Sequence, residues 1–260
     1  MHSAVIGEDF VIDVALPTDL SARTEPLPVI YLTDGNMMFP MVNSTLRLLQ
    51  AGEDLPQALL VGIGYREAHQ AMALRTRDLT PTFDPAYFEL ARHMGAPVPE
   101  HIRSGGADLF ADFIDEEVKP FIRRHYPASD KQDTLLGDSL GGLFTLHTLF
   151  TRPSSYHRYV AGSPSLWWDN TMLFETEAAY AAANKDLNAS LFISIGALEE
   201  PAEGPAQWAK MVTNMKKMTD RLRQRAYPSL QLSAYEFEGE THSSVIPATF
   251  SRGLRAVFGT

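Results

Sequence analysis

The residues best suited to chemistry form a short glycine-rich motif, Gly137-Asp138-Ser139-Leu140-Gly141. A serine in a G-x-S-x-G pattern sits on a tight turn between a strand and a helix, where small neighbours leave its hydroxyl exposed. An apolar stretch precedes this motif, and a stretch with helical character, residues 143–150, follows it. The spacing therefore predicts Ser139 as a nucleophile that attacks an acyl carbonyl, with the positive end of the following helix aimed at the turn.

A serine nucleophile needs a base, and three histidines follow Ser139: His147, His157 and His242. His147 lies two turns into the predicted helix and points away from the turn, and His157 precedes a strand, at the wrong end of a parallel sheet. His242 follows the last predicted strand, at the edge where such sheets bind ligands. Enzymes with this serine turn place the triad in the order Ser, acid, His, so we expect His242 to be the base.

The acid that would orient the imidazole has several candidates. Glu199 and Glu200 follow the strand predicted over residues 191–195, where the third member of the triad usually lies. Asp169 competes from a position after the preceding strand. We expect Glu199, while Glu200, Asp169 and a Ser–His dyad without an acid stay open.

The negative charge that develops on the attacked carbonyl needs backbone N–H donors. Leu140, the residue after the nucleophile, supplies one donor in this kind of turn. We expect the other from Gly35, in the loop Thr33-Asp34-Gly35-Asn36-Met37 that follows the second predicted strand. An ordinary Asp-Gly turn is the alternative interpretation of this loop.

Strand-like and helix-like stretches alternate along almost the whole chain, which predicts an α/β fold with a mostly parallel central sheet and helices on both faces. The predicted strands are residues 10–16, 29–32, 58–63, 134–136, 159–161, 191–195 and 230–237. Further helices are predicted over residues 108–126, 206–226 and 245–258, and Trp208 falls on the apolar stripe of the second. Pro120 should kink the first of these helices or mark a second start.

Regular patterns lapse between residues 80 and 106, where several prolines and glycines interrupt any long element. Long irregular excursions in compact enzymes are often lids or pocket walls. We therefore expect one α/β domain over residues 1–260, with a lid-like or pocket-wall excursion at about 80–106.

Composition limits the partners. With 22 Lys and Arg against 32 Asp and Glu, the formal net charge of −10 disfavours nucleic acid and anionic lipid. No apolar run approaches the ~20 residues of a membrane span, and residues 1–9 lack a secretory-signal pattern, so we expect a cytoplasmic protein with no membrane partner. The absence of Cys, of a zinc-binding histidine motif and of phosphate- or dinucleotide-binding fingerprints predicts no metal and no cofactor. The sequence leaves the oligomeric state unknown.

Segments in order along most of the chain resemble the putative-esterase branch of the α/β-hydrolases, which includes trilactone-siderophore esterases, S-formylglutathione hydrolase and feruloyl esterases. They are PVIYLTDGN (28–36), VGIGY (61–65), RDLTP (77–81), GGAD (105–108), the serine turn, SPSLWW (163–168) and GETH (239–242). The resemblance implies Ser139 as nucleophile, His242 as base and the Gly35 and Leu140 amides as oxyanion hole. Many relatives carry His where this chain has Asp138, a side chain that we expect to face away from the substrate.

The substrate pocket is predicted from residues near these groups. Trp167 and Trp168 follow a strand at the catalytic edge, where aromatic rings would flank an acyl or alcohol group, although one of them should belong to the core. Asn36, Met37 and Phe39, beside or beyond the oxyanion loop, are further candidates for the pocket wall.

Three arginines, Arg75, Arg77 and Arg103, border the irregular excursion. They would either meet an anionic substrate or form structural ion pairs.

The sequence thus predicts a cofactor-independent serine esterase that hydrolyses a small-molecule carboxylic ester through an acyl-enzyme. A trilactone-siderophore esterase is a narrower version of the same prediction. An acyltransferase of the same superfamily, with a sugar or alcohol as acceptor, and a non-catalytic binding module with a hydrolase fold are the alternatives.

Overall fold

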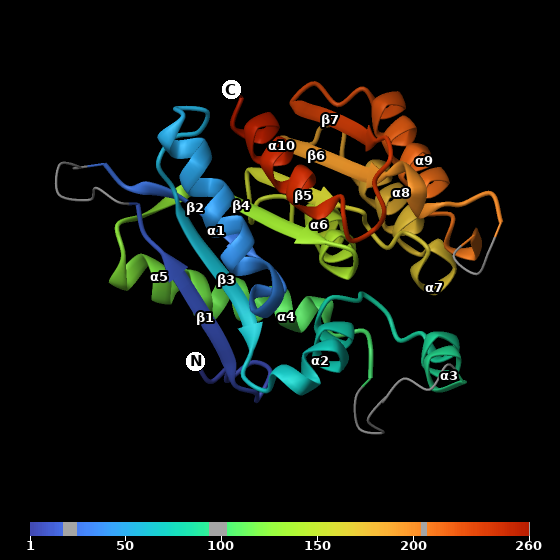
Figure 1. Ribbon diagram of the computed structural model, residues 1–260, viewed down its shortest axis with the longest axis horizontal. Coiled ribbons are helices and arrows are strands. Elements are labelled where there is room, and N and C mark those ends of the chain that lie inside the picture. Colours follow the sequence, from blue (N-terminus) through green and yellow to red (C-terminus); the bar gives the residue numbers. More distant parts are fainter. Residues whose placement is uncertain (18–24, 94–102, 204–206, 260) are drawn as a thin grey trace.

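The computed structural model describes residues 1–17, 25–93, 103–203 and 207–259, and its centre is a seven-stranded sheet (Figure 1). The strands are β1 (Phe10–Ala15), β2 (Leu27–Leu32), β3 (Leu59–Tyr65), β4 (Ala128–Asp138), β5 (Arg158–Gly162), β6 (Ala189–Gly196) and β7 (Leu230–Phe237). Their order across the sheet is β1-β3-β2-β4-β5-β6-β7, with β1 antiparallel to β3 and the other neighbours parallel. Each predicted strand overlaps one of these, which confirms the α/β prediction.

Helices cover both faces of the sheet. The described helices are α1 (Gly35–Ala51), α2 (Ala71–Asp78), α3 (Pro85–His93), α4 (Ala107–Phe113), α5 (Lys119–His125), α6 (Leu140–Thr151), α7 (Trp168–Thr171), α8 (Leu173–Ala183), α9 (Met211–Arg225) and α10 (Ile246–Phe258). Helices α1 and α10 lie on one face, where Val42 and Phe250 join one apolar cluster (Figure 1). Helices α4, α5, α6, α8 and α9 cover the other face, where Phe144 and Met218 join a second cluster. In the described part of the chain, no helix is both long and apolar enough to cross a bilayer.

The helix predicted over residues 108–126 is continuous but contains a π-helical turn. Helix α4 leads into a π-helical turn, Ile114–Val118, and α5 begins at Lys119 with Pro120 in its first turn. Proline has no N–H to donate and crowds the preceding turn, and the π-helical turn lies directly before it. Of the two effects predicted for Pro120, a local distortion fits the structure and a second start does not, because Val118 and Lys119 keep helical dihedral angles.

The helix predicted over residues 206–226 is shorter than expected, because α9 begins only at Met211. Lys210 precedes it with a positive φ of 44°, and residues 207–209 form a separate 3-10 turn. Residue 206 lies outside the described residues. Trp208 is therefore out of phase with the apolar stripe of α9, and its side chain is 56% exposed, which corrects the prediction that it packs in the core.

The excursion predicted at about 80–106 includes α3, while residues 94–102 lie outside the described residues. Its two ends are joined, since the backbone N–H of Ala107 donates to the Thr80 carbonyl at 3.1 Å and that of Gly106 to the Arg77 carbonyl at 2.8 Å. Tyr87 of α3 packs its ring against Trp167 and Trp168, which follow β5. The described part of the excursion therefore sits beside the carboxyl ends of the strands.

Candidate active site

Ser139 lies at the turn between β4 and α6 in a strained backbone conformation, with φ 61° and ψ −118°. A non-glycine residue adopts a positive φ only where its surroundings hold it there. Here the Ser139 N–H donates to the Gly162 carbonyl at 2.9 Å, and its own carbonyl accepts from the N–H groups of Leu143 and Ser165 at 3.0 and 3.1 Å. These contacts fix the turn that the glycine-rich motif predicts.

The loop after β2 packs closely against this turn. A Cβ on Gly141 would collide with the Thr33 side chain and come within 3.4 Å of an Asp34 carboxylate oxygen, so only glycine allows this approach. Gly35 and Leu140 are the first residues of α1 and α6, where N–H groups lack intrahelical acceptors. Among the described residues, neither N–H has a hydrogen-bond acceptor. The N–H groups of Gly35 and Leu140, at the starts of two adjacent helices, are therefore free to donate to a ligand.

Glu199 and His242 form a short hydrogen bond, 2.6 Å between Glu199 Oε2 and His242 Nδ1. The Glu199 side chain is 1% exposed and the imidazole 46% exposed. The other carboxylate oxygen, Oε1, accepts from the Ser163 hydroxyl at 2.6 Å and from the Gly196 N–H at 2.7 Å. Three donors therefore hold a buried carboxylate against one edge of the imidazole, and the bond to Glu199 raises the pKa of His242 above its ordinary value.

The competing acids and bases lie elsewhere. Glu200 accepts from the backbone N–H and hydroxyl of Thr213, at 2.6 and 2.7 Å. His147, two turns along α6, has its Nε2 2.9 Å from an Asp108 carboxylate oxygen. The structure therefore brings Glu199, of the candidate acids, into contact with His242.

Ser139, Glu199 and His242 line one cavity of about 250 Å³, together with Ser165, Trp167 and Trp208. We call this cavity the inner pocket. Ser139 Oγ lies 3.4 Å from Ser165 Oγ, and within the described ranges no hydrogen bond joins Ser139 to His242. Catalytic hydrogen bonds are often long in a ligand-free enzyme and tighten when substrate binds.

The predicted wall residues divide into two groups. Trp167 lines the inner pocket, whereas Trp168 is fully buried and donates from Nε1 to the Thr82 carbonyl at 3.3 Å. Trp168 is therefore a core residue, which corrects its predicted substrate contact and agrees with the expectation that one of the two indoles belongs to the core.

The side chains that follow the oxyanion loop also differ in placement. The amide of Asn36 is engaged with the backbone of Tyr65, donating to its carbonyl at 2.8 Å and accepting from its N–H at 2.5 Å. Phe39 packs against Gly62 of β3. Met37 is 59% exposed and is not among the residues that line the inner pocket. Asn36 and Phe39 thus attach α1 to the sheet instead of facing a substrate.

The arginines beside the excursion form structural contacts. Arg75 makes two hydrogen bonds to the buried carboxylate of Asp34, at 2.8 and 2.9 Å. Arg77 makes two to Asp78, at 2.7 and 3.0 Å, and Arg103 lies over the ring of Phe83 at 5.5 Å. Of the two predicted uses, ion pairing is the one observed for Arg75 and Arg77.

Asp138 is buried behind the serine turn, beside Gly162 and Thr249, and does not line the inner pocket. In the described part of the chain its Oδ1 has no hydrogen-bond partner. Burial raises the pKa of this carboxyl from 3.8 to about 7. No group of three His, Asp or Glu side chains among the described residues is arranged to hold a metal ion.

Sequence reasoning missed several residues of the site. Ser163 and Ser165 belong to the segment SPSLWW, but no periodicity marks serines that contact a carboxylate and a nucleophile. Ser163 also has a positive φ of 37°. The Asp34–Arg75 pair joins residues 41 apart in the chain, so no local pattern could have found it.

Comparisons with known proteins agree with this geometry. A sequence family described as "Putative esterase" matches residues 3–245. The ferri-bacillibactin esterase BesA of Bacillus subtilis is 35% identical over 88% of this chain and 78% of its own length. The siderophore triacetylfusarinine C esterase of Aspergillus fumigatus is 33% identical over 97% of this chain and 89% of its own.

A solved structure extends the agreement to three dimensions. The BES protein from Bacillus cereus superimposes with a TM-score of 0.82 at 31% identity, covering 99% of this chain and 93% of its own. The chain therefore belongs to the putative esterase family of α/β-hydrolases and is a serine-hydrolase esterase that cleaves carboxylic esters.

Proposed function

We propose that Ser139, His242 and Glu199 are the nucleophile, base and acid of this esterase. The observation that carries the proposal is the 2.6 Å bond between Glu199 and His242 at the wall of a cavity that Ser139 also lines. A carboxylate on Nδ1 fixes the tautomer in which Nε2 is free to accept a proton.

In the first half of the reaction, Ser139 Oγ forms a bond to the ester carbonyl carbon while His242 Nε2 takes the hydroxyl proton. The Gly35 and Leu140 N–H groups donate to the oxyanion. Glu199 stabilises the imidazolium, which then gives its proton to the leaving alcohol as the ester C–O bond breaks.

In the second half, water attacks the acyl-enzyme, and His242 again takes a proton and returns it to Ser139. The acyl group leaves as a carboxylic acid. Ser165, whose hydroxyl lies 3.4 Å from Ser139 Oγ, would position the nucleophile between turnovers.

We further propose a siderophore ester as the natural substrate class. Two relatives that align over most of this chain are named as esterases of ferri-bacillibactin and of triacetylfusarinine C. A cytoplasmic location and a single domain stay predictions from the sequence.

The role of Ser139 is tested by Ser139→Ala, with p-nitrophenyl acetate as substrate. Loss of a serine nucleophile should lower kcat by about 10⁴-fold or more, and should abolish labelling by a fluorophosphonate probe. Ser44→Ala, which removes an exposed hydroxyl from α1, is the matched control and should keep both properties. Activity of Ser139→Ala within about tenfold of the wild type would refute the assignment.

The substrate class is tested by comparing cyclic and linear siderophore esters with aryl esters, feruloyl esters and acyl thioesters. We expect the highest kcat/KM for a siderophore ester. A higher value for acyl thioesters or feruloyl esters would assign the enzyme to another branch of the family. Transfer of the acyl group to an added alcohol in preference to water would favour the acyltransferase alternative.

A further inference from the structure

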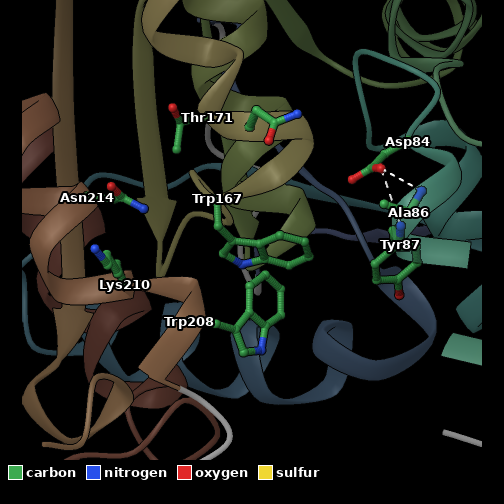
Figure 2. Close-up of a pocket in the computed structure, with 9 residues that line it drawn as sticks. Asp84, Ala86, Tyr87, Trp167, Thr171, Trp208, Lys210 and Asn214 are labelled. Atoms are coloured by element: carbon green, nitrogen blue, oxygen red, sulfur yellow. Dashed lines mark hydrogen bonds between the residues drawn. The ribbon is translucent and has the colours of Figure 1, made fainter. Parts of the chain in front are cut away.

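The inner pocket and a neighbouring cavity, which share Trp167 and Trp208 as walls, lie at the carboxyl ends of the strands (Figure 2). A separate cavity of about 280 Å³ lies at the opposite end of the sheet, where β5, β6 and β7 begin. The carboxyl end of α10 lies at this end of the sheet too (Figure 1). We call this cavity the far pocket; the residues that line it include Arg158, Asn188, Ser190, Gln231 and Phe258.

Three polar side chains of the far pocket form a row across adjacent strands. Arg158 of β5 is the register partner of Ser190 of β6, and Ser190 is that of Gln231 of β7. Register partners in a parallel sheet project to the same face, and the Ser190 hydroxyl donates to Gln231 Oε1 at 3.2 Å. Helix α10 packs on this face, where the Arg158 guanidinium lies 4.4 Å from the centre of the Phe258 ring. The sheet register therefore brings a guanidinium and the NH₂ group of an amide to one cavity.

The guanidinium of Arg158 has no counter-ion. Among the described residues, no carboxylate pairs with it, and its buried Nη1 has no hydrogen-bond partner. Burial lowers the pKa of Arg158 below its ordinary value. A guanidinium that is withdrawn from water without a compensating charge raises the free energy of the folded protein. An anion that enters the far pocket would offset part of this cost.

The rest of the lining is rich in donors. In the described part of the chain, no Asp or Glu lines the far pocket, although the sequence has 32 acidic residues against 22 basic ones. Asp186, which lies outside the lining, accepts from the backbone N–H groups of Leu187 and Ser229 at 2.8 and 2.9 Å, so its charge is already engaged. His157 and Asn188 bring ring and amide N–H donors to the lining. The far pocket therefore suits an anion better than a cation.

We propose that the far pocket binds a phosphate-class oxyanion, either inorganic phosphate or a small phosphomonoester, which pairs with Arg158 and accepts from the Gln231 amide. A guanidinium can donate two parallel hydrogen bonds to an anion of this kind. The cavity is slightly smaller than the roughly 300–1,000 Å³ of most small-molecule sites, which fits a ligand of few heavy atoms. Arg158 begins β5, whereas Ser139 follows β4 at the other end of the sheet, so this site is separate from the ester site.

The test is titration calorimetry with inorganic phosphate and with glycerol 3-phosphate, at constant ionic strength and without other multivalent anions. The wild type should bind at least one of them saturably. Arg158→Gln should weaken this binding by about tenfold or more, because it removes charge-assisted hydrogen bonds. Gln231→Leu, a second variant on the exposed edge strand β7, should weaken it by about threefold, since it removes a neutral donor.

Arg252→Gln is the matched control. Arg252 also stacks on an aromatic ring on the α10 face of the sheet, 3.6 Å from the centre of the Tyr235 ring, but it does not line the far pocket. Its replacement removes the same charge, so the affinity for phosphate should stay within about twofold of the wild type. The melting temperatures should agree with the titrations: phosphate should raise those of the wild type and Arg252→Gln more than that of Arg158→Gln.

The two ligands distinguish the possible sources of the anion. Tighter binding of glycerol 3-phosphate would identify a phosphomonoester, and tighter binding of inorganic phosphate would identify the free anion. Absence of saturable binding of either ligand to the wild type, or equal weakening in Arg158→Gln and Arg252→Gln, would overturn the site. Inhibition of p-nitrophenyl acetate hydrolysis by phosphate, with the same inhibition constant as the binding and unchanged in Arg158→Gln, would place the anion at Ser139 and would also overturn it.

Discussion

Arg75 of α2 holds the buried carboxylate of Asp34 with two parallel hydrogen bonds, at 2.8 and 2.9 Å. Asp34 itself has a left-handed backbone, with φ 56°, immediately before Gly35. A bidentate guanidinium fixes both the position and the orientation of a carboxylate. The pair therefore holds the loop that presents one of the two proposed oxyanion donors.

This relationship predicts that Arg75→Lys lowers kcat more than it raises KM. A lysine ammonium cannot form the two parallel, coplanar hydrogen bonds that the guanidinium donates to Asp34. The loop should therefore shift and misplace the Gly35 N–H donor. Removing an oxyanion donor outright costs about 10²–10³ in kcat, so we expect a loss of about tenfold to hundredfold with p-nitrophenyl acetate.

The matched control is Arg66→Lys, because Arg66 forms an exposed pair with Asp9, at 2.8 Å. It should leave kcat within about twofold, since exposed ion pairs contribute little. A drop in the melting temperature of Arg75→Lys with unchanged kcat would mean that the pair supports only the fold.

The features predicted correctly from the sequence are those that depend on a local pattern of residues. Nearly unbroken apolar runs identified strands such as β3 and β6, and the fixed spacing around Ser139 identified the turn. The position of His242 followed from the parallel topology, which brings the carboxyl ends of the strands to one edge.

Features that depend on a single backbone torsion or on a distant contact were not predictable. Trp208 has the spacing of the apolar stripe of α9. However, the positive φ of Lys210 ends the helical geometry before Met211, so Trp208 lies outside the helix and is exposed. Trp167 and Trp168 are neighbours of the same type, and the turn after β5 alone decides which indole faces the inner pocket.

Glu199→Gln should lower kcat by about 10² to 10⁴-fold, because a neutral amide stabilises the imidazolium poorly and can hold the wrong tautomer. The bond to Glu199 raises the pKa of His242, so its loss should lower that pKa. Because the base works unprotonated, the acid limb of the kcat/KM profile should move to lower pH.

Glu200→Gln is the control, since Glu200 bonds to Thr213 and not to the imidazole. Its pH profile should match that of the wild type. An unshifted acid limb in Glu199→Gln, or an equal loss of kcat in both variants, would exclude Glu199 as the acid.

Asp138→Asn should change stability in a pH-dependent way. Burial raises the pKa of Asp138 from 3.8 to about 7, so between these values the folded protein keeps a proton that the unfolded chain releases. The stability due to the neutral carboxyl is fully present below about pH 4 and is lost as the pH rises to about 7. An amide does not titrate. From pH 5 to pH 8 the free energy of unfolding of the wild type should therefore fall by about 2–3 kcal/mol relative to that of Asp138→Asn.

Urea denaturation at pH 5 and pH 8 measures this difference, with Asp220→Asn as the control. Asp220 is 64% exposed and pairs with Arg223 on the surface of α9, so its replacement should change the free energy of unfolding by a similar small amount at both pH values. If the difference between Asp138→Asn and the wild type is the same at both pH values, Asp138 does not titrate between them in the folded protein. That outcome would contradict the pKa of about 7 that burial gives this carboxyl, because a group with that pKa loses its proton between pH 5 and pH 8.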